Sequence, residues 1–415
     1  MKKDILKAAL IFLFAIPLSF ISCEENPDED LPKEPVHINL TEVETNLVGS
    51  GNDFAFDIFR KVLENEIESK NVMISPLSIS YALSMTVNGA DGTTREAMLE
   101  ALRVNGITVN NMNEAYKELT KALLSVDKRV IISIANSVWT EKDFAVKQQF
   151  IDILTNYYDA ESRSFYIDDK TVPDQVNGWI EDKTNGLIKD MIDELDPNAI
   201  MLLINAIYFK GKWKFEFDKD DTSGRPFYMN TGSSSSIPTM YRKGDVKVYV
   251  GNGFKIGEFP YGQGNYVMDI ILPDTQNGLP ELLPSITDEA FTGWISQLNE
   301  TETEVYLPRF KYGYKKLLNE ILSDMGMGIA FSDFADFTNI AETPPLQISR
   351  VLHQSFIETN EEGTEAAAVT VVEIRVTSAP STFLFKADHP FIYIIREVTT
   401  GSILFMGRVA DPSAE

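Results

Sequence analysis

Few side chains of this sequence could perform catalysis or bind a metal. The chain has three histidines, His37, His353 and His389, and one cysteine, Cys23, so neither a histidine-built metal site nor an intramolecular disulfide is expected. The usual nucleophile, zinc, phosphate-binding and calcium-binding motifs do not occur in it. Gly262-Gln263-Gly264 lacks the third glycine of a dinucleotide-binding loop, and its place between two strand patterns predicts a hairpin turn. We therefore expect no enzymatic activity, no cofactor and no metal.

The most unusual segment runs from Glu361 to Pro380, and it alternates with period two. Its even positions carry only small or β-branched side chains: Thr364, Ala366, Ala368, Thr370, Val372, Ile374 and Val376. From Thr364 onward the charges fall on the odd positions: Glu365, Ala367, Val369, Val371, Glu373, Arg375 and Thr377. This alternation is typical of a strand with one buried and one wetter face.

The same segment is too long for an ordinary strand. It runs about 14 residues without proline, whereas common strands have about 5–6. Two readings stay open from the residues alone, a long edge strand and an alanine-rich helix over residues 364–372. We favour a third, in which the segment is an exposed loop in one state and a central strand in another, because a permanently exposed strand of this length would promote aggregation.

The N-terminus has the pattern of a secretory signal. Three lysines within residues 2–7 precede an apolar run over 8–21, which is too short for a transmembrane helix. The run ends at Ser22-Cys23, which resembles a bacterial lipobox, so we expect residues 1–22 to be removed and Cys23 to be lipidated. The alternative is a buried cysteine of a helix. Residues 23–37 are rich in acids and proline and predict an extended tether.

This tether also bears on localisation. An acidic run after a lipidated cysteine resembles the surface-export signal of some Gram-negative lipoproteins, although a merely solvated tether explains it equally well. We expect the protein to cross the inner membrane and to be anchored through Cys23 at the outer membrane or cell surface of a Gram-negative bacterium.

The composition and the net charge of the chain limit both its fold class and the partners that it can bind. The chain has 415 residues, 44% of them apolar and 24% charged, which excludes disorder for most of its length. Its formal net charge of −25 argues against binding nucleic acid or anionic lipid through surface charge. The length alone predicts about two or three domains, but residues 38–415 contain no linker or composition break.

Periodicity predicts helices early in the chain and strands late, in one mixed α+β body. The expected helices are 50–70, 77–87, 93–103, 113–125, 145–158, 173–192 and 311–326. The expected strands are 130–139, 202–209, 246–250, 254–259, 265–272, 303–310, 347–358, 382–386, 391–396 and 402–409.

The stretch Glu361-Glu362-Gly363-Thr364-Glu365-Ala366-Ala367-Ala368 resembles the hinge of inhibitory serpins. Further serpin-like motifs follow in family order over residues 40–412: Asn71-Val72-Met73-Ile74-Ser75-Pro76-Leu77-Ser78, Asn177-x-Trp179 with Thr184 and Gly186-x-Ile188, Leu203–Trp213, Val305–Phe310, Ala387–Phe391 and Ile403–Val409. The resemblance implies a single-domain serpin fold over 38–415, with helices packed on a large main β-sheet, further sheets and an exposed reactive loop.

The resemblance also implies a mechanism. A serpin offers its reactive loop as bait, and after cleavage the hinge inserts into the main sheet as a new central strand and drags the acylated protease with it. An inserting strand tolerates small uncharged inward residues and no proline. The alternation described above meets these requirements, so we interpret the chain as an inhibitor of serine proteases.

Two polar clusters are expected by the same resemblance. The shutter, under the middle of the sheet, comprises Ser75, Ser78, Asn205 and His353. The breach, at the top of the sheet, comprises Trp213, Arg309 and Glu361, and an Arg309–Glu361 pair there would hold the hinge out before cleavage.

Family spacing places the scissile bond at Thr377–Ser378, and Arg375–Val376 is a second candidate. Thr377 and Val376 suit an elastase-like protease, whereas Arg375 suits a trypsin-like one or is merely a solvated charge. The expected partner is a target serine protease held as a covalent acyl complex by a monomer, without nucleic acid or glycosaminoglycan. The alternatives are a non-inhibitory serpin acting as carrier, chaperone or storage protein, and an unrelated surface hydrolase.

Overall fold

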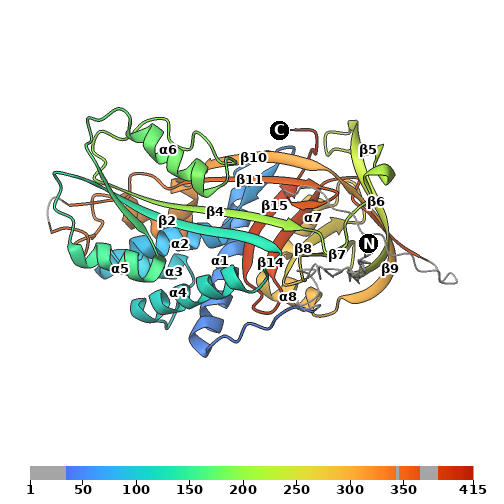
Figure 1. The fold of residues 1–415 in the computed structure, drawn as a ribbon, viewed down its shortest axis with the longest axis horizontal. Coiled ribbons are helices and arrows are strands. Elements are labelled where there is room, and N and C mark those ends of the chain that lie inside the picture. The colour runs from blue at the N-terminus through green and yellow to red at the C-terminus, as the bar shows by residue number, and fades with distance from the viewer. Residues whose placement is uncertain (1–33, 343–344, 365–381, 415) are drawn as a thin grey trace, which may run out of the picture. The chain divides into compact units, whose positions relative to one another are not determined.

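The computed structural model describes residues 34–342, 345–364 and 382–414. Contacts divide the chain into two units, Met1–Pro32 and Lys33–Glu415, and all of the described residues belong to the second. Figure 1 shows that this unit combines two β-sheets with helices packed on them. The predicted mixed α+β class is confirmed.

The main sheet has six strands in the order β10-β11-β12-β4-β2-β3. Their bounds are β10 Phe310–Leu317, β11 Leu352–Asn360, β12 Gly363–Thr364, β4 Met201–Lys212, β2 Val130–Glu141 and β3 Glu161–Phe165. Neighbours are antiparallel except β2 and β3, which are parallel. The sheet thus places the short strand β12, which contains part of the hinge, between two longer strands.

The second sheet has nine strands, and the C-terminal strands lie within it. The order is β1-β15-β14-β8-β7-β6-β9-β13, with β5 paired to β6. Their bounds are β1 Val72–Ile74, β5 Ser223–Tyr228, β6 Ser234–Val250, β7 Phe254–Tyr261, β8 Tyr266–Pro273, β9 Asn299–Pro308, β13 Phe383–Lys386, β14 Phe391–Glu397 and β15 Ile403–Val409. Gly262 to Gly264 form the turn between β7 and β8, as predicted, with φ of 53° at Gly262 and 108° at Gly264.

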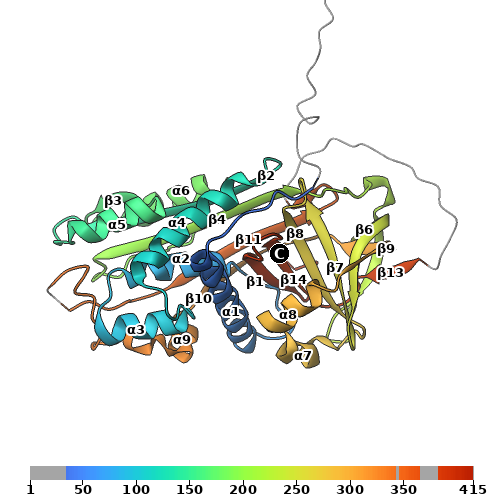
Figure 2. The same cartoon turned by 90° about the horizontal axis from the view of Figure 1, so that it is seen from below.

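Helices lie on both faces of the main sheet, and two more pack against the second sheet. They are α1 Glu42–Glu64, α2 Pro76–Val87, α3 Gly92–Ala101, α4 Val109–Ser125, α5 Gln148–Tyr158, α6 Val172–Lys183, α7 Leu279–Leu282, α8 Asp288–Ile295 and α9 Asn319–Leu322, with single-turn helices at Lys219–Asp221, Leu283–Ser285, Ser323–Met327 and Gly328–Phe331. Apolar residues of α1 and α2 pack with Ile207 and Phe209 of β4, whereas α6 packs on the opposite face against Ile204 and Ala206 (Figure 2). Alternate residues of β4 therefore serve two different cores.

Local chemistry explains where the helices beneath the sheet begin. Thr41 and Glu44 form a capping box at the start of α1. Ser75 caps α2, whose first residue is Pro76, so α2 begins directly under the main sheet. This start places the Ser75 and Ser78 side chains in the interior.

For three of these elements the structure differs from the sequence expectation in type or in extent. Of the helix expected over 311–326, residues 311–317 belong to strand β10, because Phe310, Tyr312 and Tyr314 alternate inward with exposed neighbours, and the helix begins only at Asn319. The helix expected over 173–192 ends at Lys183, since Asn185 and Gly186 adopt positive φ and reverse the chain. The strand expected at 246–250 is the end of β6, which begins at Ser234.

Candidate functional site

The first residues of the hinge already lie inside the main sheet. Gly363 and Thr364 pair on one side with Asn360 and Thr359 of β11, and on the other with Lys212 and Gly211 of β4. Within the described residues, β11 and β4 are joined only through this two-residue strand. The hinge therefore enters the sheet at one end of the gap between β4 and β11 (Figure 1).

Glycine is the only residue type that fits position 363. Its φ is 144°, a backbone conformation that side chains disfavour. A Cβ placed there would lie 2.1 Å from the carbonyl oxygen of Gly211 and 2.7 Å from the Cα of Lys212. Because both of these are backbone atoms of β4, a side chain at position 363 would push the hinge out of the gap.

Thr364 and Trp213 form the inner lining of this end of the gap. Thr364 is buried, and its hydroxyl lies 2.8 Å from the Tyr261 hydroxyl. The Trp213 ring stacks on Tyr261 with centroids 4.4 Å apart, and its Nε1 donates a 2.9 Å hydrogen bond to the Asn360 carbonyl oxygen. Trp213 thus fixes the turn that leads from β11 into the hinge.

Two buried carboxylates stand at that turn. Glu361 accepts hydrogen bonds from Arg309, at 2.7 Å from Nε, and from the Thr222 hydroxyl. Glu362 pairs with Lys219, and this contact raises the pKa of the lysine, whereas the other carboxylate oxygen of Glu362 is buried without a hydrogen-bond partner. The structure thus brings the three breach residues together, and it adds Thr222 and Lys219, which lie in an acidic loop segment without a distinguishing sequence signal.

Directly beyond Thr364 the gap between β4 and β11 contains a small cavity. Its walls include Ile207 and Phe209 of β4, Phe356 and Ile357 of β11, and Thr364 itself at one end. Apolar walls of this kind accept small side chains without leaving polar groups unpaired.

The four shutter residues form a connected polar cluster beneath the same gap. The Ser75 amide donates to Nε2 of His353 at 3.1 Å, and the Ser75 hydroxyl donates to the Leu404 carbonyl oxygen at 2.8 Å. The Ser78 hydroxyl donates to Oδ1 of Asn205, and Asn205 donates to Oδ1 of Asn136 at 2.7 Å. Asn136 of β2 was missed by the sequence analysis, although its place in a strand otherwise rich in apolar residues was a signal.

His353 is held neutral in this cluster. Burial lowers the pKa of its imidazole from 6.5 to about 4. Its Nε2 accepts the Ser75 amide hydrogen, so this nitrogen carries no proton. Protonation of His353 would therefore break a hydrogen bond between α2 and β11.

The remaining predicted site residues lie outside the described residues. These are Glu365, Ala366, Ala367 and Ala368 of the hinge, Arg375, Val376, Thr377 and Ser378 of the candidate bonds, and Cys23. Among the residues that are described, no cluster of histidine, cysteine, aspartate and glutamate could hold a metal ion. In that same part of the chain, no helix is long and apolar enough to cross a membrane.

Comparison with known proteins places this geometry in a family. The family model "Serpin (serine protease inhibitor)" matches residues 50–412. Human serpin B11 is 33% identical over 385 residues, which cover 87% of this chain and 98% of that protein. An uncharacterized serpin-like protein of Methanosarcina acetivorans is 32% identical over 381 residues, which cover 89% of each chain.

Solved structures agree in fold. Human thyroxine-binding globulin in complex with thyroxine has a TM-score of 0.82 at 25% identity, covering 90% of this chain and all of that one. Tengpin, a thermophilic serpin in its native state, has a TM-score of 0.80 at 31% identity, covering 92% of this chain and 97% of that one. The predicted serpin fold is thus confirmed, and the chain belongs to the serpin family of serine protease inhibitors.

Proposed function

We propose that this serpin inhibits serine proteases as a suicide substrate. A target protease cleaves the reactive loop at Thr377–Ser378, and the hinge then inserts between β4 and β11 while the protease remains attached as an acyl complex. Thr377 and Val376 favour an elastase-like target, because small and β-branched side chains suit a shallow apolar specificity pocket. Arg375 offers a second bond to trypsin-like proteases.

The observation that carries this proposal is the register of β12. Since Thr364 pairs with both Gly211 and Thr359, an antiparallel continuation on insertion would place Ala366 between Phe209 and Ile357. It would then place Ala368 between Ile207 and Ser355. The first of these places lies at the small cavity beyond Thr364, whose walls include Phe209 and Ile357.

The same continuation explains the even–odd pattern of the sequence. Thr364, Phe209 and Ile357 are buried on the inner face of the sheet, so the even positions of the hinge would follow them inward. An inserted strand gains backbone hydrogen bonds to both neighbours, each worth about 1 kcal/mol net. Insertion is therefore favoured once cleavage frees the loop.

The test mixes the purified body, residues 33–415, with an elastase and separates the products on a denaturing gel. Residues 33–415 form one compact unit, and they contain the whole region, 50–412, that matches the serpin family model. The match to thyroxine-binding globulin covers the whole of that chain and 90% of this one, so the same fold forms there without a counterpart of the remaining residues. We expect a denaturant-resistant band at the summed mass and a released C-terminal peptide that begins at Ser378. Cleavage without that band, for both elastase-like and trypsin-like proteases, would contradict the proposal.

A pair of variants separates insertion from cleavage. Thr364→Arg places a charge against Tyr261 inside the sheet, so we expect the loop to be cut while the complex band disappears. Glu365→Arg changes a neighbouring odd position, which the alternation assigns to the outer face. We expect this control to retain the complex.

The likeness to thyroxine-binding globulin, a chain solved with thyroxine, favours a second candidate, a carrier without inhibitory activity. The two candidates differ in the stability of the cleaved form. An inhibitor whose hinge inserts gains a large rise in melting temperature on cleavage. A cleaved form that melts like the intact protein, with no complex band, would favour the carrier.

We infer further that the protein is a lipoprotein anchored to a membrane through Cys23 and exported beyond the inner membrane of a Gram-negative bacterium. The sequence of residues 1–37 supports this. Acyl chains anchor by burying methylene groups at about 0.8 kcal/mol each. We expect Cys23→Ala to move the protein from the membrane fraction to the soluble fraction. Mass spectrometry of the N-terminal peptide would identify the acyl groups, and an unmodified Cys23 would contradict the inference.

A further inference from the structure

A cavity far along the chain from the hinge lies between the C-terminal half of α1 and residues 279–286, which include α7. Its volume is about 310 Å³. Its walls are mostly apolar, with Phe56, Phe59 and Leu63 from α1 facing Leu279, Leu283 and Ile286. A cavity of this size and lining is in the range of sites that bind small molecules.

Two polar atoms in the wall of this cavity lack a protein partner. The Nε of Arg60 and the Oδ1 of Asn230 are both buried, and neither has a hydrogen bond to another protein group. One of these atoms is a donor and the other an acceptor. Buried atoms of this kind cost free energy unless something pairs with them.

The charges that line the cavity balance. Arg60 and Arg408 contribute positive charge, and Glu64 and Glu68 contribute negative charge. Arg408 is committed to backbone, because it donates to the carbonyl oxygens of Ile67 and Lys70 at 2.7 and 2.9 Å. A balanced lining gives no preference for an anion or a cation, so the occupant that suits it is uncharged.

A hydroxyl group fits the two unpaired atoms, because one hydroxyl can accept from Arg60 and donate to Asn230. An engineered cavity of about 150 Å³ holds benzene, so about twice that volume holds a fused two-ring system. We propose that this cavity binds an uncharged, two-ring apolar molecule carrying a hydroxyl group, oriented by Arg60 and Asn230. This site is separate from the hinge and does not depend on protease trapping.

The test uses two ligands that differ in one group, a hydroxyl in the first and a methoxy group in the second. 2-Naphthol can donate to Asn230, whereas 2-methoxynaphthalene keeps the rings and the acceptor oxygen but has no donor. Fluorescence titration of the body, residues 33–415, should give a Kd for 2-naphthol of about 0.1 mM, with 2-methoxynaphthalene about tenfold weaker.

Variants then locate the site. Asn230→Leu should weaken 2-naphthol about tenfold and leave 2-methoxynaphthalene unchanged, because only the former uses the amide oxygen. Leu283→Trp should abolish binding of both ligands by filling the cavity. Leu124→Trp, at an exposed position of α4, is the matched control and should change neither.

Three outcomes would overturn the proposal. The first is the absence of saturable 2-naphthol binding up to about 1 mM, roughly tenfold above the expected Kd. The second is binding that survives Leu283→Trp with its affinity intact. The third is equal affinity of the two ligands for the unmodified protein, which would remove the hydroxyl from the recognition. If Leu283→Trp does not fold, the comparison at Asn230 decides alone, since that side-chain oxygen has no protein partner to lose.

Discussion

Glu361 Oε1 lies 2.6 Å from Nη2 and 2.7 Å from Nε of Arg309, and this pair ties the end of β11 to the residue that follows β9. The carboxylate is only 2% exposed, whereas the arginine side chain is 42% exposed. The pair therefore holds a buried negative charge in place with a partly solvated positive one. The pair lies at the turn between β11 and β12, directly before the hinge enters the sheet.

Glu361→Lys should loosen this turn. The variant replaces the pair with two positive charges, so the native state should lose about 2 kcal/mol, and the melting temperature should fall by about 4 °C. We also expect faster spontaneous loop insertion or polymerisation on warming, measured by native gels. Glu358→Lys is the matched control, because Glu358 lies on β11 and forms a surface pair with Lys311 of the neighbouring strand β10. A polymer yield equal to that of the unmodified protein would count against this role of Glu361.

Gly363→Ala should block the start of insertion. The added Cβ would lie 2.1 Å from the Gly211 carbonyl oxygen and 2.7 Å from the Lys212 Cα, so the hinge cannot keep its present place in the sheet. We expect the rate of complex formation with the target protease to fall at least tenfold while cleavage continues. Gly232→Ala is the control, because Gly232 also has a positive φ, of 80°, but a Cβ there meets nothing within 4 Å. Normal trapping by Gly363→Ala would refute the steric argument.

Acidification should destabilise the protein through His353. Its folded pKa of about 4 lies below the ordinary 6.5, so the unfolded state binds the proton first as the pH falls. The stabilisation is therefore complete above pH 6.5 and is lost progressively down to about pH 4, by about 2 kcal/mol at pH 5. We expect His353→Gln to lose less stability than the unmodified protein between pH 7.5 and 5, as measured by chemical denaturation. Parallel pH profiles for the two proteins would show that His353 is not the cause.

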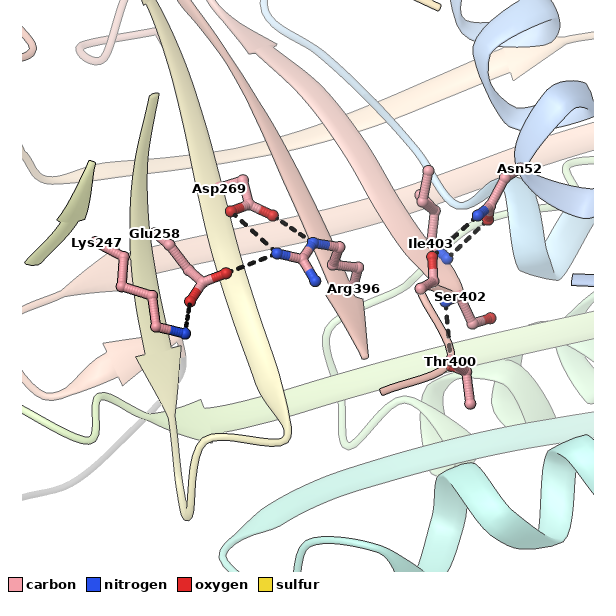
Figure 3. A network of polar contacts seen from close by, with 9 residues as sticks. Asn52, Lys247, Glu258, Asp269, Arg396, Thr400, Ser402 and Ile403 are labelled. Atoms are coloured by element: carbon pink, nitrogen blue, oxygen red, sulfur yellow. Dashed lines mark hydrogen bonds and ion pairs between the residues drawn. The ribbon is translucent and has the colours of Figure 1, made fainter. Parts of the chain in front are cut away.

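Arg396→Met should destabilise the second sheet strongly. Arg396 of β14 donates to Asp269 of β8 at 2.7 Å and to Glu258 of β7 at 2.6 Å, and Lys247 of β6 completes this row of charges (Figure 3). Removing the arginine leaves two buried carboxylates facing each other, which should cost about 3–5 kcal/mol.

Lys247→Met is the control for the same row. The lysine side chain is 59% exposed, so we expect a loss of no more than about 1 kcal/mol. Denaturant unfolding of both variants measures the difference. Equal small effects would mean that the carboxylates find other partners or become protonated without cost.

The sequence predicted correctly which residues meet at the hinge, but it predicted the helices and strands that contain such residues less accurately. Trp213, Arg309 and Glu361 are far apart in the chain, yet family motifs placed all three at one end of the sheet, where the structure has them. The helix expected over 311–326 was wrong over residues 311–317, which form β10, whereas residues 319–326 are helical. Lys311, Lys315 and Lys316 suit either element, whereas the inward alternation of Phe310, Tyr312 and Tyr314 has period two and indicates a strand.

Other parts of the site carried no usable sequence signal. Thr222 and Lys219 lie among acidic residues that read as a solvated turn, and only the folded structure brings them to Glu361 and Glu362. The start of β6 at Ser234 was missed because a run of serines has neither apolar alternation nor strong strand propensity. Tertiary pairing with β5 and β9 makes it a strand.

The register of β12 against β4 also sets how far along the main sheet the cleaved chain would reach. Each step of one residue beyond Thr364 is a step of one residue back along β4 from Gly211, so Met201, the first residue of β4, would stand opposite Ile374. On this scale a chain cut after Arg375 ends one residue past the sheet, and a chain cut after Thr377 ends three residues past it. At about 3.3 Å per residue, the longer arm gives an attached protease about 7 Å more clearance from the edge. Under the proposed mechanism, the position of the cleaved bond along the loop would therefore set how far an attached protease stands from the far end of the sheet.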